Sequence, residues 1–395
     1  MKSLNAEQAS PKFMMQKMSF GYATAQMIFL ATKLEVADFI GDETLPSDEL
    51  AKRINEKIQE DLEKGKKTGN MNSDEPTSLI ENLDAFYRFM RSLASMGVVE
   101  EEESKCFKLT ELGKILQKQS PGSLFHLIRW RDEVGSEMWR HLEKCVKTGK
   151  SAFELEYGKG MFDYLRENPD KQVLFNEAMT SNVSSNIDRN LVKRITQIIN
   201  ESKSEPSNSA LRIVDVGGGH GSLLLSILEE IQDSESEGVI FDLENVIQDT
   251  RNEIKNHPYA KQCKCISGSF FESVSSENDE EYSRNEEDYV KNGDFYLLVS
   301  ILHDWDDERC LPILKNIRNA MSKHSKLLII ELVIPSGKEQ WFFTIADMGM
   351  MILTEGGRER TKHEYQELLK QAGYELNRVI PTNSIVSIVE AVPVL

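Results

Sequence analysis

The sequence predicts an α/β protein, with a doubly wound sheet in the C-terminal half and a mostly helical N-terminal part before it. From Leu211 onward, short β-rich apolar runs alternate with helical stretches. A glycine-rich turn, Gly217–Gly221, joins the first of these runs to a helix. Before residue 200, by contrast, apolar residues recur mainly at helical spacing.

The first elements of the N-terminal half are predicted to be helices. Apolar residues recur at roughly helical spacing over residues 12–40. A second helix is expected over Ser47–Ile54, with Ser47 as its N-cap. Residues 56–78 are polar and lack periodicity, so we expect them to form a solvated insertion.

The segment after this insertion has the outline of a winged helix. A helix is expected to end at Met96, Gly97 to form a turn, and Val98–Glu100 and Cys106–Leu109 to form short strands. Winged helices often bind DNA, but this helix carries mixed charges, at Asp84, Arg88 and Arg91. A role in packing or dimerisation therefore fits this half better than nucleic-acid binding.

The C-terminal half should form the sheet. Its five predicted strands lie within residues 211–219, 238–244, 263–270, 293–302 and 326–334. Helices are expected within residues 223–231 and 310–321, and surface loops at 201–209 and 275–293. The predicted domains are residues 1–130, a mostly helical connector of residues 131–200, and residues 201–395.

Composition limits the partners and the location of the chain. The formal net charge of −18 over 395 residues disfavours nucleic acid and anionic membranes. The N-terminus does not resemble a signal peptide, and no run of about 18 uncharged apolar residues would span a membrane. The scattered cysteines suit neither a disulfide framework nor a zinc site, and they favour a cytoplasmic protein. They are Cys106, Cys145, Cys263, Cys265 and Cys310.

The strongest local motif is Asp215-Val-Gly217-Gly-Gly219-His-Gly221, between a predicted strand and a predicted helix. Glycines let the backbone turn tightly and let a ligand approach it closely. A dinucleotide-binding turn needs its third glycine one residue later, where this chain has Ser222. A carboxylate at Asp215 would also repel a pyrophosphate. A cationic ligand suits it better, which favours S-adenosylmethionine over NAD.

Asp242 ends the next predicted strand and supports the same interpretation. An acidic side chain at this place can accept hydrogen bonds from both ribose hydroxyls of a nucleoside. The position alone is a weak signal, but it strengthens the glycine motif before it.

A later strand delivers His303 to the C-terminal edge of the sheet, where ligands bind in open α/β folds. His303 is therefore a candidate general base. The alternative is a surface histidine before a helix, with Asp306 and Asp307 as cap and first-turn acids. A metal site is a further alternative, but capping already explains these acids, so no metal is predicted.

Five motifs together carry a resemblance to a known family. DVGGGHG, FDL, LHDWDDE, IIE and GGRERT occur in this order and spacing. The set resembles the caffeate- and acetylserotonin-type small-molecule O-methyltransferases, which include many bacterial natural-product enzymes. The likeness is dense in the C-terminal half and looser over Phe20–Ile40 and Phe86–Glu101.

The resemblance implies a Rossmann-like domain that binds S-adenosylmethionine and a winged-helix-like domain that builds a homodimer. The reaction would methylate a hydroxyl of a small aromatic molecule and release S-adenosylhomocysteine. His303 would be the catalytic base, with Asp304 beside it, while Glu331 and Glu359 hold the imidazole in orientation. The implied cofactor-binding residues are Asp215, Gly217, Gly219, Gly221, Asp242, Leu243, Ser269, Phe270, Ser300 and Met179.

Two positions depart from the plant members of the family. Ser269 stands where those members place an aspartate beside the adenine, so that contact lacks a carboxylate's charge. Val299 stands where they place a lysine, which leaves Ser300 and the backbone to serve instead. Met179 would flank the methyl donor, although a packing role explains a methionine equally well.

The acceptor pocket is less well defined by the sequence. An apolar pocket for an aromatic molecule is suggested by Met138, Trp139, Trp341, Phe343, Met348 and Met351, which could equally be ordinary core. Two other functions stay open: an enzyme of the same fold that uses the cofactor for chemistry other than methylation, and a non-catalytic dimeric binding or regulatory protein.

Overall fold

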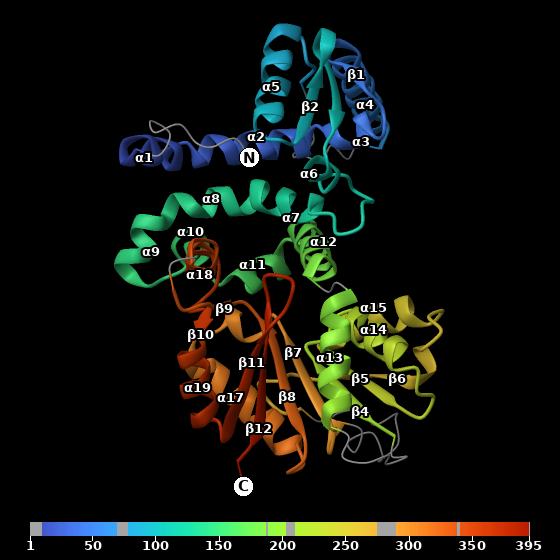
Figure 1. The fold of residues 1–395 in the computed structure, drawn as a ribbon, viewed down its shortest axis with the longest axis vertical. Helices are drawn as coiled ribbons and strands as arrows, with labels where there is room; N and C mark the ends of the chain where they lie inside the picture. The colour runs from blue at the N-terminus through green and yellow to red at the C-terminus, as the bar shows by residue number, and fades with distance from the viewer. Residues whose placement is uncertain are drawn as a thin grey trace. The chain divides into compact units, whose positions relative to one another are not determined.

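The computed structural model describes residues 10–68, 78–186, 189–202, 210–274, 290–337 and 340–394. The chain forms two compact units (Figure 1). Unit 1 comprises Met1–Glu137 and Leu165–Ser185, and unit 2 comprises Met138–Tyr164 and Asn186–Leu395. The segment expected to connect two domains, residues 131–200, is thus divided between the two units.

The N-terminal segment is helical, but the single helix expected over residues 12–40 is three helices. They are α1 (Pro11–Ser19), α2 (Gly21–Lys33) and α3 (Val36–Ile40). The chain breaks between α2 and α3 at Glu35, whose backbone is left-handed with φ 52°. Helix α1 has no buried residue, and its apolar side chains Phe13, Met14, Met15 and Met18 are exposed.

Helix α4 (Ser47–Thr68) is much longer than expected. The prediction of a solvated insertion is wrong for residues 56–68, which continue this helix; residues 69–77 lie outside the described residues. The reason is a stripe of apolar side chains at helical spacing: Ile54 and Ile58 are buried and Leu62 packs against the same core.

Next comes a small sheet, as the sequence predicts. Helix α5 (Leu83–Ser95) ends before Gly97, whose φ of 81° makes the turn, and strands β2 (Val99–Glu102) and β3 (Cys106–Leu109) pair antiparallel. Strand β1 (Leu45–Pro46) adds to the other edge of β3, which gives the order β1-β3-β2. The fully buried Phe107 joins this sheet to the helices of unit 1.

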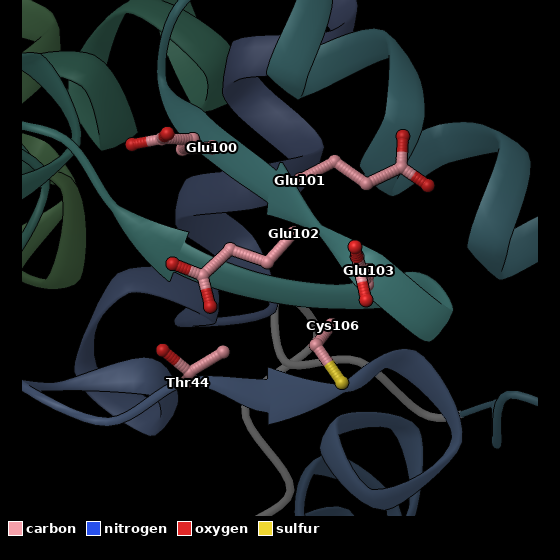
Figure 2. Close-up of a pocket in the computed structure, with 6 residues that line it drawn as sticks. All are labelled: Thr44, Glu100, Glu101, Glu102, Glu103 and Cys106. Atoms are coloured by element: carbon pink, nitrogen blue, oxygen red, sulfur yellow. The ribbon is translucent and has the colours of Figure 1, made fainter.

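The strand β2 and its following turn present a negative surface. Glu100, Glu101, Glu102 and Glu103 line a hollow beside Thr44 and Cys106 (Figure 2). Lys108 forms ion pairs with Glu100 and Glu102 at 3.5 and 2.6 Å. The hydroxyl of Tyr87 donates a hydrogen bond to Glu101. Lys108 and Tyr87 thus partner three of the four glutamates that line this hollow.

The segment from Glu111 to Ser202 is mostly helical, as predicted for residues 131–200. In unit 1 the helices are α6 (Glu111–Lys114), α7 (Phe125–Trp130), the π-helix η2 (Arg131–Gly135) and α12 (Pro169–Asn186). The others are α8 (Ser136–Met138), η3 (Trp139–His141), α9 (Leu142–Thr148), α10 (Ala152–Tyr157), α11 (Met161–Glu167) and α13 (Arg189–Ser202).

Unit 2 is built on a seven-stranded sheet with the order β11-β12-β8-β7-β4-β5-β6. The five parallel strands are the predicted ones: β4 (Arg212–Val216), β5 (Glu237–Asp242), β6 (Cys263–Ser267), β7 (Phe295–Val299) and β8 (Lys326–Glu331). Antiparallel strands β12 (Ser387–Pro393) and β11 (Tyr374–Pro381) complete it. Strand order reverses at β4, between β5 and β7, and open α/β sheets bind ligands at such a point.

Helices cover both faces of this sheet, as a doubly wound fold requires (Figure 1). One core lies between the sheet and α13, α14 (Ser222–Ile231) and α15 (Glu244–Ile254). The other lies between the sheet and α17 (Asp307–Ala320) and α19 (Lys362–Gln371). Because each fully buried Leu, Ile or Val contributes about 1.5–3 kcal/mol, these two cores hold the strand ends firmly.

The remaining elements of unit 2 are the 3-10 turn η4 (Ala260–Gln262), which directly precedes β6, and a group that follows β7 and β8. That group comprises the 3-10 turn η5 (Leu302–Asp304), the short parallel pair β9 (Val333–Ile334) and β10 (Arg360–Thr361), and helix α18 (Trp341–Leu353). A further 3-10 turn, η1 (Glu103–Lys105), lies in unit 1. Among the described residues, no helix has the length and apolarity needed to cross a bilayer.

Candidate active site

The glycine loop follows β4 at the point where the strand order reverses. Gly217, Gly219 and Gly221 all have positive φ, at 74°, 52° and 74°. A side chain at Gly217 would place its Cβ 2.5 Å from the Cδ1 of Ile301, and one at Gly221 would lie 2.4 Å from Ile240. The loop therefore needs glycine for its backbone conformation and for its close packing.

Two side chains fix the centre of this loop. The N–H of Gly219 donates to Oδ2 of Asp242 at 2.9 Å, and the hydroxyl of Thr250 donates to the Gly219 carbonyl at 2.8 Å. Asp242 also accepts from the N–H of Leu243 at 2.7 Å. Burial raises the pKa of Asp242, and the two N–H donors oppose that rise. The carboxylate is thus held in place, with lone pairs left for further donors.

Asp215 lies beneath the loop and is almost fully buried, with 2% exposure. Its Oδ1 has no hydrogen-bond partner in the structure. Burial, together with the nearby Asp242, raises the pKa of Asp215 to about 7. A buried carboxyl oxygen without a partner is uncommon in a native protein and indicates a place for a donor or a cation.

The other predicted cofactor residues of unit 2 follow the ends of β5, β6 and β7. Ser269 accepts a hydrogen bond from the N–H of Phe271, and Asn316 donates to the carbonyl of Phe270. Ser300 has a left-handed backbone with φ 53° between β7 and η5. Leu243, after β5, is exposed.

Met179 belongs to α12 in unit 1 and is partly buried there. The remaining cofactor candidates all belong to unit 2. The expectation that Met179 flanks the methyl donor stays a prediction.

His303 lies on the turn η5, directly after β7. Its Nδ1 is 3.2 Å from Oε1 of Glu359, and its Nε2 is 3.7 Å from Oδ1 of Asp304. The side chain of Glu359 is 1% exposed and that of His303 is 17% exposed. A carboxylate on Nδ1 favours the tautomer with the proton on that nitrogen, which leaves Nε2 to accept a proton.

The carboxylates around His303 control its titration. Burial lowers the pKa of the imidazole, but Asp304, Glu359 and Glu331 outweigh burial and raise it to about 10. Burial also raises the pKa of Asp304 to about 6, against the attraction of His303. These carboxylates therefore favour the protonated imidazole. A role as a base requires that binding lowers this pKa.

Glu331 contacts the backbone beside His303 and not the imidazole. Its Oε1 accepts the N–H groups of Ile301, Leu302 and His303 at 2.9, 2.6 and 3.3 Å. Its Oε2 accepts a hydrogen bond from the hydroxyl of Tyr365. The expectation that Glu331 holds the ring is thus corrected: it holds the turn that carries the ring, and Glu359 holds the ring.

The segment of Glu359 packs directly on this turn. The N–H of Arg358 donates to the carbonyl of His303 at 2.8 Å. A side chain at Gly357 would place its Cβ 2.5 Å from that carbonyl oxygen. Asp347, on α18, accepts the N–H of Glu359 at 3.0 Å. Sequence reasoning missed Asp347, whose only signal is its position as an acid in an otherwise apolar helix.

Arg360 is the other residue that sequence reasoning missed. Its side chain is fully buried. Arg360 donates hydrogen bonds to the turn around His303 and to Asp307, and it does not form an ion pair with Glu359.

The acids after His303 are confirmed as helix-terminal residues, since Asp306 caps α17 through the N–H of Arg309. No group of three metal-binding side chains was found among the described residues.

The candidate acceptor residues differ in exposure. On α18, Trp341 is 68% exposed, whereas Phe343, Met348 and Met351 are partly buried. Met138 is fully buried, which supports the core alternative for it, and Trp139 is partly buried. The aromatic surface of α18 is thus the accessible part of this set.

Comparisons with known proteins agree on one family. Residues 139–375 match the family model described as an O-methyltransferase domain. The chain is 31% identical to a phenazine O-methyltransferase of Lysobacter antibioticus over 379 residues, which cover 96% of this chain and 95% of that protein. It is 30% identical to a 3-amino-4-hydroxybenzoate 4-O-methyltransferase of Streptomyces cremeus, over 75% of this chain and 73% of that protein.

A solved methyltransferase structure is also similar to this chain. The methyltransferase CalO1 of calicheamicin biosynthesis, in an S-adenosylhomocysteine-bound form, aligns with a TM-score of 0.72 and 25% identity, over 99% of both chains.

Proposed function

Because this chain belongs to the O-methyltransferase family, we propose that it transfers a methyl group to a hydroxyl oxygen of a small aromatic molecule, with His303 as the general base. Family membership makes the chain an enzyme with S-adenosylmethionine as its cofactor. The non-catalytic alternative is therefore set aside. The single observation that carries the proposal is the imidazole of His303, held at Nδ1 by Glu359 at the carboxyl end of β7.

The residues after β4 and β5 fit this cofactor. The unpartnered carboxyl oxygen of Asp215 suits the cationic end of the molecule, and the glycine loop lets it approach the backbone. Asp242, whose carboxylate is held by the N–H of Gly219, would accept the ribose hydroxyls. When bound, S-adenosylmethionine supplies a methyl group on a sulfonium, already activated for in-line attack by an oxygen. NAD fits less well, since Asp215 would repel its pyrophosphate.

We assign the outer part of the cofactor site to residues after β5, β6 and β7. Ser269 and Phe270 would meet the adenine, and Leu243 and Ser300 would complete the pocket. Ser269 offers a hydrogen bond without charge, so adenine recognition there would be weaker than with a carboxylate.

His303 has the geometry of a base that acts through Nε2, beside Asp304. Glu359 accepts a hydrogen bond from Nδ1–H, so Nε2 would receive the proton of the acceptor hydroxyl. A phenol of pKa near 10 is mostly neutral at pH 7, and a positioned base contributes about 10²- to 10⁴-fold in rate. Positive charge brought next to Asp304 and Glu359 would lower the pKa of His303 from about 10 toward the working range.

The acceptor is proposed to be an aromatic hydroxyl compound of natural-product type. The names of the relatives refer to phenazine and aminohydroxybenzoate acceptors. The aromatic side chains Trp341 and Phe343 on α18 offer flat surfaces to a ring, and α18 is tied to Glu359 through Asp347. Met348 and Met351 offer adaptable contacts on the same helix.

We further propose a winged-helix-like dimerisation role for residues 1–130, a helical connector over 131–200 and a methyltransferase domain over 201–395. Helix α1 has no buried residue and exposes Met15 and Met18, and Phe20, directly after it, is also exposed, so a second copy would bury them. A homodimer is the partner that fits such a surface.

The experiment is a panel of hydroxylated aromatics incubated with the protein and trideuteromethyl S-adenosylmethionine. The panel includes a hydroxyphenazine, 3-amino-4-hydroxybenzoate and a flavonol, each with its deoxy analogue as control. We expect mass spectrometry to find one labelled methyl on oxygen and stoichiometric S-adenosylhomocysteine. A product without the label but with an added oxygen or a lost carboxyl would favour the same-fold enzyme with other chemistry.

A further inference from the structure

The turn that carries His303 is held between two buried side chains of opposite charge. At its start, Glu331 accepts the N–H groups of Ile301 and Leu302. At its end, Arg360 donates from Nη1 to the carbonyl of Leu302 and from Nη2 to the carbonyl of Trp305, both at 2.9 Å. An anion at the N–H end and a cation at the carbonyl end complement the dipole of a helical turn.

Burying the side chain of Arg360 at this turn costs free energy. Its side chain has 0% exposure, and removing a guanidinium from water is unfavourable unless its donors are satisfied. Nε and Nη2 both reach Oδ1 of Asp307, at 3.0 and 2.8 Å, and Nη2 lies 3.4 Å from the thiol of Cys310. Asp307 is half exposed, so the buried bonds of Arg360 are mainly those to the turn.

We propose that Glu331 and Arg360 form a buried charge clamp that positions His303, which makes Arg360 a positioning residue for the reaction. The inference rests on the proposed role of His303 in that reaction. The clamp acts on the backbone, whereas Glu359 acts on the ring. Together they leave the imidazole without freedom to rotate or shift away from the end of β7.

The surroundings of Arg360 explain why its charge matters. Six carboxylates belong to this region: Asp304, Asp307, Glu331, Asp347, Glu359 and Glu364. The other titratable groups around it are His303, Cys310 and Tyr365. Burial disfavours the charged guanidinium, but these neighbours raise the pKa of Arg360 above its ordinary value. Removing its permanent positive charge would leave Glu331 buried without its counter-charge.

The clamp predicts a pH-dependent defect in stability. Removing the cation raises the pKa values of the nearby carboxylates, so the variant takes up protons more readily. The melting temperature of Arg360→Met should therefore fall further below wild type at about pH 8 than at about pH 5.5. Arg360→Lys retains the charge with fewer donors, and its deficit should be smaller and nearly independent of pH.

The test compares these variants with Glu331→Gln and with the double variant. In the clamp, Arg360→Met combined with Glu331→Gln should recover at least half of the melting temperature that Arg360→Met loses at about pH 8, because position 331 then no longer holds a buried charge without its counter-charge. Arg318→Met is the matched control: Arg318 also donates to a backbone carbonyl, that of Val394, at 2.7 Å. Its deficit should not change with pH. Equal deficits of Arg360→Met at both pH values, or additive losses in the double variant, would overturn the clamp.

A second readout follows the ring itself. With ¹³C-labelled histidine, the His303 signal is assigned by its disappearance in His303→Ala. We expect Arg360→Met to shift or broaden this signal, while Arg318→Met leaves it unchanged. An unshifted His303 signal in folded Arg360→Met would refute the positioning role. Neither readout needs an acceptor, so a failure of the methylation panel would contradict the proposed function without affecting this result.

Discussion

Glu359→Gln is the substitution that isolates the electrostatic part of the His303 site. The carboxylate oxygen lies 3.2 Å from Nδ1, and the side chain is almost completely buried. Glutamine has the same shape, and its carbonyl oxygen can still accept a hydrogen bond from Nδ1–H. The change therefore removes one negative charge and leaves the orientation of the ring nearly intact.

The magnitude follows from the contact. An opposite charge within about 4–6 Å shifts a pKa by about 1–3 units, which corresponds to roughly 1.4–4 kcal/mol. Since Glu359 raises the pKa of His303, glutamine should lower it by about that amount from about 10. The neutral imidazole then forms at lower pH, so the acid limb of the kcat/KM profile should move down by about 1–3 pH units. The plateau at high pH should fall, because a weaker base accepts the proton less well.

The assay is the pH dependence of initial rates with the best acceptor of the panel, together with the pH titration of the labelled His303 signal. Glu355→Gln is the matched control, because Glu355 lies in the same segment and pairs with Arg309 at 3.9 Å. Its acid limb should coincide with wild type. An acid limb that stays in place in Glu359→Gln, or moves to higher pH, would refute the electrostatic reasoning.

Four further outcomes are expected. Asp242→Ala should weaken S-adenosylhomocysteine binding at least tenfold in calorimetry, about 2–4 kcal/mol, because it removes charge-assisted bonds to the ribose; unchanged affinity would count against that role. Gly221→Ala should lower the melting temperature, since a left-handed backbone costs a non-glycine residue about 1–2 kcal/mol. Glu390→Gln should destabilise the protein at neutral pH and progressively less as the pH falls below the ordinary pKa of a glutamate. Burial raises the pKa of Glu390, but Lys326, Arg378 and Asn377 outweigh it, so the stabilisation is present above its ordinary pKa and is lost on acidification. Sedimentation should give twice the 45.0 kDa chain mass, and a monomer at micromolar concentration would contradict the dimer.

Much of unit 2 could be predicted because its parallel strands are short, buried and apolar. The run around Val214 and the motif after it locate both a strand and a turn, since glycine adopts a positive φ more readily than any other residue. Strands β11 and β12 were not predicted. In β11, Tyr374, Leu376 and Ile380 recur at even spacing, and this period-2 pattern could have identified the strand. Strand β12 is buried at four consecutive residues and does not alternate.

In unit 1 the main wrong prediction was the solvated insertion, which was inferred from the polar composition of the segment. Residues 56–68 are rich in charge, yet Ile58 and Leu62 continue the apolar stripe of Ile54. One buried residue per helical turn is enough to hold a helix whose other faces are solvated. Composition averaged over the segment hides this stripe, whereas residue spacing reveals it.

The site was predictable in its residues and less so in its contacts. The order of the motifs predicts that Glu359 lies beside His303, and in the structure Glu359 contacts Nδ1 of His303. The contacts of Glu331 and Arg360 depend on which way each side chain turns from its strand end, and sequence spacing does not contain that information. A fully buried arginine is also rare enough that an exposed loop residue is the natural expectation for GGRERT.

The central claim is that His303 removes the acceptor proton in a methyl transfer. It is tested most directly by the single-turnover rate of His303→Ala with saturating S-adenosylmethionine and the best aromatic acceptor. We expect the rate at neutral pH to fall about 10²- to 10⁴-fold, with cofactor affinity nearly unchanged, and the deficit to shrink as pH rises toward the acceptor's pKa. A wild-type rate at saturation, accompanied by weakened cofactor binding, would contradict the account and make His303 a binding residue.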